Sequence, residues 1–177
     1  MTGSLKPVRI LGIDPGSRIT GYGIIDFHKD HARHVASGCI QLRGGDLTVR
    51  LRAIFDGITA IVESEAPAEL AVEQVFFARN AASALKLGQA RGAALMAGIA
   101  RGLPLYEYSP NAVKQAVTGR GHAPKDQVQH MIKMLLCLRE LPASDAADAL
   151  AVAICHGHTS QTRARIAMSA ARAGTHR

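Results

Sequence analysis

An apolar run near the start of the chain ends abruptly in a carboxylate and a turn, in the segment LGIDPGS over residues 11–17. The residues before Asp14 predict a buried β-strand, and an ionised carboxylate at the end of such a strand is costly to desolvate unless a cation meets it. Pro15 and Gly16 stop the strand, because proline lacks the N–H that a ladder needs and glycine tolerates a sharp turn. Asp14 therefore lies at the rim of a predicted sheet, where it either belongs to a site or only caps the turn.

The length and composition of the chain predict one domain of an ordinary α/β type. Its 177 residues are enough to bury a sizeable core without disulfides, and with 47% hydrophobic but only 4% aromatic residues the core must consist largely of Ala, Leu, Ile and Val. No apolar run approaches the ~20 residues that span a bilayer, and residues 1–7 are too short and polar for a signal peptide. We therefore expect a cytoplasmic protein with no membrane partner.

The charge and the cysteines restrict the partners further. The formal net charge is +7 with the histidines taken as neutral, which favours a polyanion such as nucleic acid or an acidic membrane surface. The cysteines are three in number and lie in apolar segments, which favours reduced thiols. Cys155, His156 and His158 lack a second ligand pair at zinc-finger spacing, so we do not expect zinc.

The periodicity of apolar residues predicts where the strands and helices lie. Residues 8–14, 21–28 and 34–42 predict a meander of three antiparallel strands. A helix N-capped by Asp46 then leads to a fourth strand over residues 70–73, which should lie parallel to the first because a helix connects the two. If these two strands are neighbours, their ends bring Glu73 and Asp14 to the same rim of the sheet.

A long helix over residues 79–101, a short strand over residues 105–108, and helices beginning at Pro110 and Pro124 follow. The long helix contains three glycines, and each weakens a helix by ~1 kcal/mol relative to alanine. Close packing against a sheet, another helix or a second subunit would compensate for this cost.

The last predicted helix runs from Asp145 to about His156. Asp145 and Asp148 are three residues apart, so their Cβ atoms lie about 5–6 Å from each other on one face. The alternative is that these two acids only stabilise the helix N-terminus. From Thr159 the periodicity is lost and arginines gather, which predicts a flexible basic tail. The predicted division is an N-terminal extension over residues 1–7, a folded domain over residues 8–158 and a tail over residues 159–177.

Asp14, Glu73, Asp145 and Asp148 together predict a strongly negative pocket whose ligands are all oxygens. Magnesium suits such a pocket because it is a hard cation that a few carboxylates hold together with water and substrate phosphate. Two ions about 3.5–4 Å apart can activate a water, bind the scissile phosphate and stabilise the departing oxygen. The residues thus predict phosphodiester hydrolysis with two Mg²⁺ ions, for which Mn²⁺ could substitute.

Basic side chains near the acids would hold the phosphates that the carboxylates repel. Candidates before the acidic helix are Lys114, Arg120 and Lys125. The latter two belong to a loop, residues 119–125, that enters a helix N-terminus and suits phosphate oxygens, unless it is simply a solvated turn. Lys86 and Arg91 on the long helix would extend this basic track.

Several segments together resemble the RuvC family of Holliday junction resolvases: LGIDPGSRITGYG over residues 11–23, EQVF over residues 73–76, NAASALKLGQARG over residues 80–92, VQHM over residues 128–131 and DAADAL over residues 145–150. The resemblance extends from about Ile10 to Gln161. It implies that the four acids are the metal-binding catalytic residues. It also implies that Phe76 contacts the junction and that Lys114 and Lys125 lie around the active site. In the alternative interpretation, Phe76 and Phe77 plug the core under a loop.

The same resemblance implies an RNase H-like fold of the retroviral integrase superfamily, an α/β fold with a mixed five-stranded sheet flanked by helices. It implies a homodimer that nicks two opposed strands of a four-way junction symmetrically and works alongside the RuvA–RuvB branch-migration complex. Two other classes stay open. One is a phosphotransferase of the actin and sugar-kinase type, which needs two lobes and a second Asp-Gly phosphate turn. The other is a junction- or DNA-binding module without catalysis, or a relative adapted to RNA.

Overall fold

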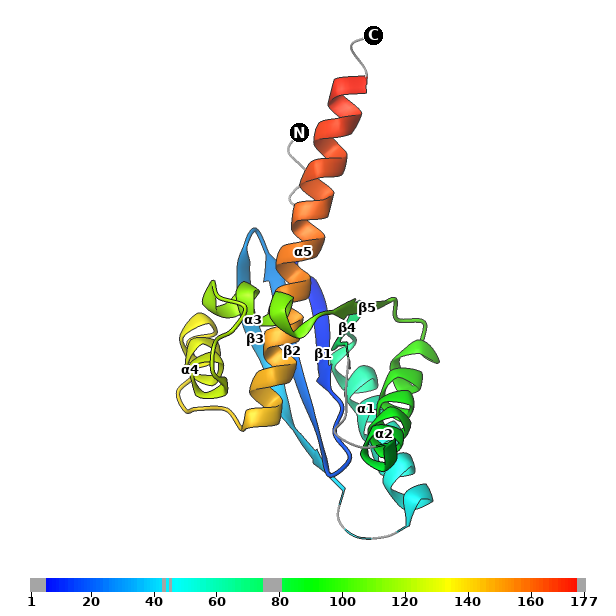
Figure 1. Ribbon diagram of the computed structural model, residues 1–177. Coiled ribbons are helices and arrows are strands. Elements are labelled where there is room, and N and C mark those ends of the chain that lie inside the picture. The colour runs from blue at the N-terminus through cyan, green and yellow to red at the C-terminus, as the bar shows by residue number, and fades with distance from the viewer. Residues whose placement is uncertain (1–5, 43, 45, 75–80, 175–177) are drawn as a thin grey trace.

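The computed structural model describes residues 6–42, 44, 46–74 and 81–174, with side chains up to residue 171. The elements follow one another as β1 (Val8–Asp14), β2 (Ile19–His28), β3 (His31–Gln41), α1 (Leu47–Glu65), β4 (Glu69–Glu73), α2 (Ala81–Ile99), β5 (Leu105–Tyr108), α3 (Pro110–Thr118), α4 (Lys125–Leu135) and α5 (Ser144–Gly174). Figure 1 shows their arrangement.

The five strands form one mixed sheet in the order β3-β2-β1-β4-β5. β1 pairs antiparallel with β2, and β2 with β3, whereas β1 and β4 pair parallel, as do β4 and β5. The predicted meander and the predicted parallel pairing of the first and fourth strands are therefore confirmed. Because Ile13 pairs with Val72, the next residues, Asp14 and Glu73, end neighbouring strands at the same edge.

Helices cover both faces of the sheet (Figure 1). One core cluster joins residues of α3, α4 and α5 to the sheet, and a second joins residues of α1 and α2 to its other face. Local capping agrees with the sequence: the Asp46 carboxylate accepts from the Val49 N–H at 3.0 Å, and the Ser109 hydroxyl accepts from the Ala112 N–H at the start of α3.

Helix α5 lies unusually close to β1 and β2 because glycines face it. A Cβ atom at Gly12 would lie 2.0 Å from the carbonyl oxygen of Ala149, and one at Gly21 would lie 2.1 Å from that of Asp145. At Gly23 a Cβ would meet the Leu150 side chain at 2.6 Å. These backbone approaches bring the first turns of α5 directly over the end of β1.

The predicted end of the last helix near His156 is wrong, because α5 continues to Gly174 and projects beyond the rest of the protein (Figure 1). The far half of α5 is rich in alanine and arginine, which favour a helix even where no apolar stripe is present. The apolar periodicity is therefore lost where α5 no longer packs against the sheet. The hydroxyls of Thr159 and Thr162 donate to the carbonyls one turn earlier, and Arg165 pairs with Asp30 in the β2–β3 turn. The division at residue 158 into domain and tail stays a prediction.

Candidate catalytic site

Three separate elements bring the four predicted acids to one edge of the sheet. Asp14 ends β1, Glu73 ends β4, and Asp145 and Asp148 lie in the first turn and a half of α5. The close approach at Gly21, which pairs with Asp14 across β1 and β2, lets the start of α5 lie beside the end of β1. The glycine on β2 is therefore part of what assembles the acidic edge.

The carboxylates at this edge repel one another. Burial raises the pKa of Asp14 to about 7, and the charges of Asp148, Asp145 and Glu73 add to that rise, while Lys125 opposes it. The pKa of Glu73 is also raised, first by burial and then by Asp148, against the opposing charges of Lys114 and Lys125. An edge of this kind favours the binding of cations.

Glu73 and Asp148 line one cavity of about 160 Å³ together with Lys114 and Lys125. The Lys125 ammonium lies 2.7 Å from the Asp148 carboxylate. Burial lowers the pKa of Lys125, but the hydrogen bond to Asp148 and the charges of the surrounding acids outweigh burial and raise it. Both lysines therefore lie beside the acids, as the sequence predicted.

The chemistry of the donor set fits a hard divalent cation, since four carboxylates supply oxygen ligands and their mutual repulsion favours ion binding. Across the described residues, however, no three His, Cys, Asp or Glu side chains come close enough to share one ion. The fit thus rests on donor type and electrostatics.

The other predicted DNA-binding residues do not join this cavity. Lys86 lies on α2 beside Ser17 and Arg50, around a hole of about 10 Å³ on the other face of the sheet. Arg91 forms an ion pair with Glu107 and its side chain is only 14% exposed, so it is not free to bind phosphate in this conformation. Arg120 is exposed in the loop between α3 and α4. Phe76 and Phe77 lie outside the described residues.

Two features near the site escaped the sequence interpretation. Cys39 lies on β3, where burial raises the pKa of its thiol and the charges of Asp145 and Asp14 add to that rise. His156, considered above only as an unlikely zinc ligand, is fully buried and uses both ring nitrogens, one toward Glu69 and one toward Tyr108. The two hydrogen bonds of His156 have no local sequence signal, because Glu69 and Tyr108 lie on strands far away in the sequence.

The comparison with known sequences decides the family. A family model described as crossover junction endodeoxyribonuclease RuvC matches residues 10–156. The chain is 54% identical to the RuvC of Hahella chejuensis over 168 residues. The matched region covers 94% of this chain and 98% of the relative. The chain belongs to the RuvC family. The resemblance seen in the sequence motifs is therefore confirmed, and the family assignment decides against a phosphotransferase.

Solved structures agree with this assignment. The RuvC of Thermus thermophilus matches with a TM-score of 0.79 and 34% identity over 88% of this chain and 96% of that one. The same protein in complex with a Holliday junction substrate matches with a TM-score of 0.82 at the same identity and coverage. The yeast mitochondrial Holliday junction resolvase, 14% identical with a TM-score of 0.62 over 88% of this chain and 82% of that one, shares the fold. The RNase H-like fold is thus confirmed, and members of the RuvC family are metal-dependent nucleases.

Helices of the described part of the chain are all too short or too polar to span a bilayer.

Proposed function

We propose that the protein is an endonuclease that resolves Holliday junctions by paired, symmetric nicks during recombination and repair. The observation that carries the proposal is the meeting of four mutually repelling carboxylates from β1, β4 and α5 in a chain of the RuvC family. A four-way junction is the proposed substrate because the T. thermophilus relative was solved with one.

Asp14, Glu73, Asp145 and Asp148 would hold two Mg²⁺ ions, with Mn²⁺ as a substitute. When bound, these ions supply an activated water and stabilise charge on the scissile phosphate and the departing oxygen. Lys114 and Lys125 flank the acids in one cavity, so their ammonium groups are placed to contact phosphate oxygens that the carboxylates would otherwise repel. Contacts of Phe76, Lys86 and Arg120 with DNA stay predictions, as does one of Arg91, which would first have to leave Glu107.

Symmetric nicking needs two acidic sites, so we further propose a homodimer that forms through α2. Leu85, Gly88, Gly92, Met96 and Ile99 follow one another at three- and four-residue spacing along one stripe of that helix. The large side chains of this stripe are exposed, Leu85 by 63% and Met96 by 51%, and a Cβ at Gly88 or Gly92 would meet nothing within 4 Å. An exposed apolar stripe with small residues at its centre suits close packing against its symmetry mate.

Membership of the RuvC family also supports a role alongside the RuvA–RuvB branch-migration complex in the cytoplasm.

The proposal is tested by incubating the purified protein with a synthetic four-way junction, a plain duplex and an RNA–DNA hybrid, each with and without Mg²⁺. We expect paired nicks in the junction alone, and only with the metal. Asp14→Asn should keep junction binding and lose cleavage, whereas Asp56→Asn, on the exposed side of α1, should cut at the wild-type rate. Unchanged cleavage by Asp14→Asn, or metal-independent cleavage, contradicts the proposal.

A further inference from the structure

A buried polar contact that the proposed chemistry does not use joins α5 to the β4–β5 half of the sheet. The side chain of His156 is 1% exposed. Its Nε2 lies 2.6 Å from Glu69 Oε2, at the start of β4, and its Nδ1 lies 2.6 Å from the Tyr108 hydroxyl, at the end of β5. The imidazole also stacks on Tyr106, with ring centroids 4.3 Å apart. One side chain thus contacts both strands.

The partners of His156 determine which ring nitrogen carries the proton. A carboxylate only accepts, so the Nε2–H donates to Glu69, and Nδ1 then accepts from the Tyr108 hydroxyl. Burial lowers the pKa of His156 even though Glu69 opposes this, which favours the neutral ring that the arrangement requires. All hydrogen-bonding groups of the imidazole are therefore satisfied, and the ring has one defined orientation.

His156 lies in the same row as the two acids of α5. Asp145, Asp148, Val152 and His156 follow the spacing i, i+3, i+7 and i+11, which is one stripe of a helix. On β4, Glu69 and Glu73 point to the same face because they are four positions apart, an even number in a strand. The stripe on α5 therefore lies over this row on β4.

The two rows match in length. Asp148 and His156 are about 12 Å apart along the helix at 1.5 Å per residue. Glu73 and Glu69 are about 13 Å apart along the strand at 3.3 Å per residue. At one end His156 is hydrogen-bonded to Glu69, and at the other Asp148 and Glu73 line one cavity and repel. The hydrogen bond between His156 and Glu69 therefore holds α5 against β4, although Asp148 and Glu73 repel each other at the other end of the two rows.

We propose that His156, held between Glu69 and Tyr108, is a positioning residue that fixes the separation of Glu73 from Asp148 and thereby sets the affinity of the acidic edge for divalent cations. It touches neither substrate nor metal and acts through the placement of α5 over β4. The inference rests on the proposed function in taking these two acids as metal ligands.

The test compares the Mn²⁺ affinity of the DNA-free protein, measured by electron paramagnetic resonance, between the wild type and His156→Leu. Loss of the His156–Glu69 contact, which lies outside the proposed ligand sphere, should weaken Mn²⁺ binding about tenfold. In the cleavage assay the metal concentration for half-maximal rate should rise by a similar factor, and the rate at saturating Mn²⁺ should recover. His156→Gln, whose amide can still donate to Glu69, should regain part of the affinity.

A matched control separates positioning from general loss of stability. Ile58 is fully buried on α1, on the opposite face of the sheet, so Ile58→Ala destabilises the core without touching this contact. Its Mn²⁺ affinity should equal that of the wild type. Wild-type affinity in His156→Leu, or an equal loss in Ile58→Ala, overturns the inference. A wild-type protein that binds Mn²⁺ but does not cut junctions refutes the proposed function and leaves this comparison intact.

A second measurement needs neither metal nor DNA. In EDTA, Glu73→Gln removes a repelling charge and should raise the urea midpoint of the wild type. In the His156→Leu background, where the rows can separate, the rise should fall to less than half. An equal rise in both backgrounds overturns the inference. If His156→Leu does not fold, Glu69→Ala, which removes the acceptor of the Nε2–H and leaves the imidazole in place, replaces it in both measurements.

Discussion

Burial and three neighbouring carboxylates raise the pKa of Asp14 to about 7 in the folded protein, from the ordinary value of 3.8. The folded state therefore keeps a proton that the unfolded chain has already lost, and the stability that Asp14 contributes falls as the pH rises from about 4 to 7. In EDTA at pH 8, Asp14→Asn should be more stable than the wild type by about 1–3 kcal/mol. The gain should vanish toward pH 4, as urea unfolding at both pH values can measure.

Two comparisons make the Asp14 result specific. Asp56→Asn removes an exposed carboxylate from α1 and should show no comparable gain at pH 8. Saturating Mg²⁺ should shrink the advantage of Asp14→Asn, because the bound cation stabilises the wild-type carboxylate alone. If Asp14→Asn is less stable than the wild type at pH 8 in EDTA, the acids do not repel as the structure indicates.

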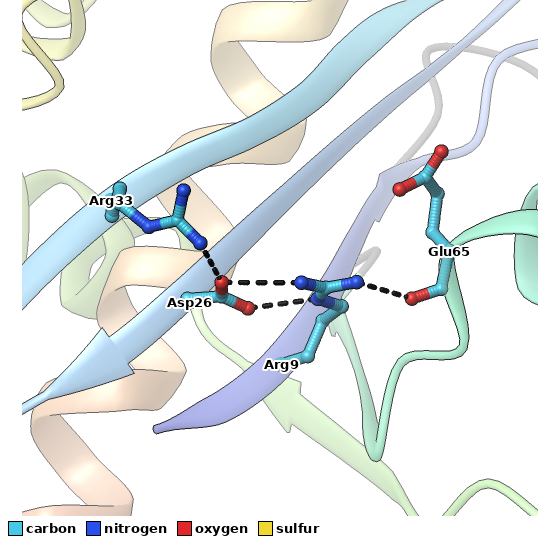
Figure 2. Close-up of polar contacts among 4 residues, drawn as sticks. All are labelled: Arg9, Asp26, Arg33 and Glu65. Atoms are coloured by element: carbon cyan, nitrogen blue, oxygen red, sulfur yellow. Dashed lines mark hydrogen bonds and ion pairs between the residues drawn. The ribbon is translucent and has the colours of Figure 1, made fainter. Parts of the chain in front are cut away.

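The surroundings of Asp26, far from the acidic edge, lower the pKa of its carboxyl, whereas those of Asp14 raise it. Figure 2 shows the contacts of Asp26. Arg9 donates two hydrogen bonds to its carboxylate, at 2.8 and 3.2 Å, Arg33 pairs with it as well, and a third donor of Arg9 reaches the Glu65 carbonyl at the end of α1. The hydrogen bond from Arg9 is the main cause that lowers the pKa of Asp26, against the effect of burial. The stability this carboxylate contributes is therefore present above its unfolded pKa and is lost as the pH falls through the folded value.

We expect Asp26→Asn to lower the free energy of unfolding at pH 7 by about 1–3 kcal/mol, because the guanidinium of Arg9 loses its charged partner. The difference from the wild type should shrink below about pH 4, where the unfolded carboxyl is protonated. Denaturant titrations at pH 7 and at about pH 2, below the lowered folded pKa, measure both values. Junction cleavage at pH 7 should not change, since the network lies at the other end of β1. A pH-independent loss would contradict the ion-pair explanation.

At the scale of elements, the glycines under α5 decide how the acidic edge forms. Gly21→Ala would place a Cβ 2.1 Å from the Asp145 carbonyl oxygen, and backbone cannot yield as a flexible side chain can. We expect a loss of about 1–3 kcal/mol in stability and a larger fall in cleavage than in junction binding, because α5 must shift. At Gly121 the same change meets atoms no closer than 3.6 Å, so Gly121→Ala should keep the stability of the wild type. Thermal unfolding and cleavage rates of both variants test this.

The elements also show which parts of the fold the sequence could predict. β1 and β4 were predictable because each is an apolar run that turn residues interrupt. The helix between them requires the two strands to be parallel, and this places Asp14 and Glu73 at the same edge of the sheet. The far half of α5 was missed because a helix that projects from the protein, with few contacts to it, carries no apolar stripe. Arg91 was predicted to contact DNA, but helical spacing does not reveal that Glu107 of β5 lies beside it. The His156 contacts were missed for the same reason, since their partners are 48 and 87 residues away.

At the scale of the whole molecule, one chain presents one acidic edge, whereas symmetric nicking of a junction needs two. The stripe along α2 is the surface that would supply the second copy, because it exposes large apolar side chains around glycines that leave room for another helix. In a two-fold symmetric contact of this kind, the same surface of both subunits takes part, so each substitution occurs twice in the interface. A single charge at its centre should therefore be strongly disruptive.

We expect Gly88→Glu to convert the proposed dimer to a folded monomer, because two carboxylates would be buried facing each other across the symmetry axis, where a glycine now stands. Sedimentation velocity and circular dichroism measure the mass and the fold. Met134→Glu, on an exposed apolar position of α4, is the matched control and should have the same mass as the wild type. The monomer should also lose the coupling between the two nicks and leave junctions cut on one strand. A dimeric Gly88→Glu protein would place the subunit interface elsewhere.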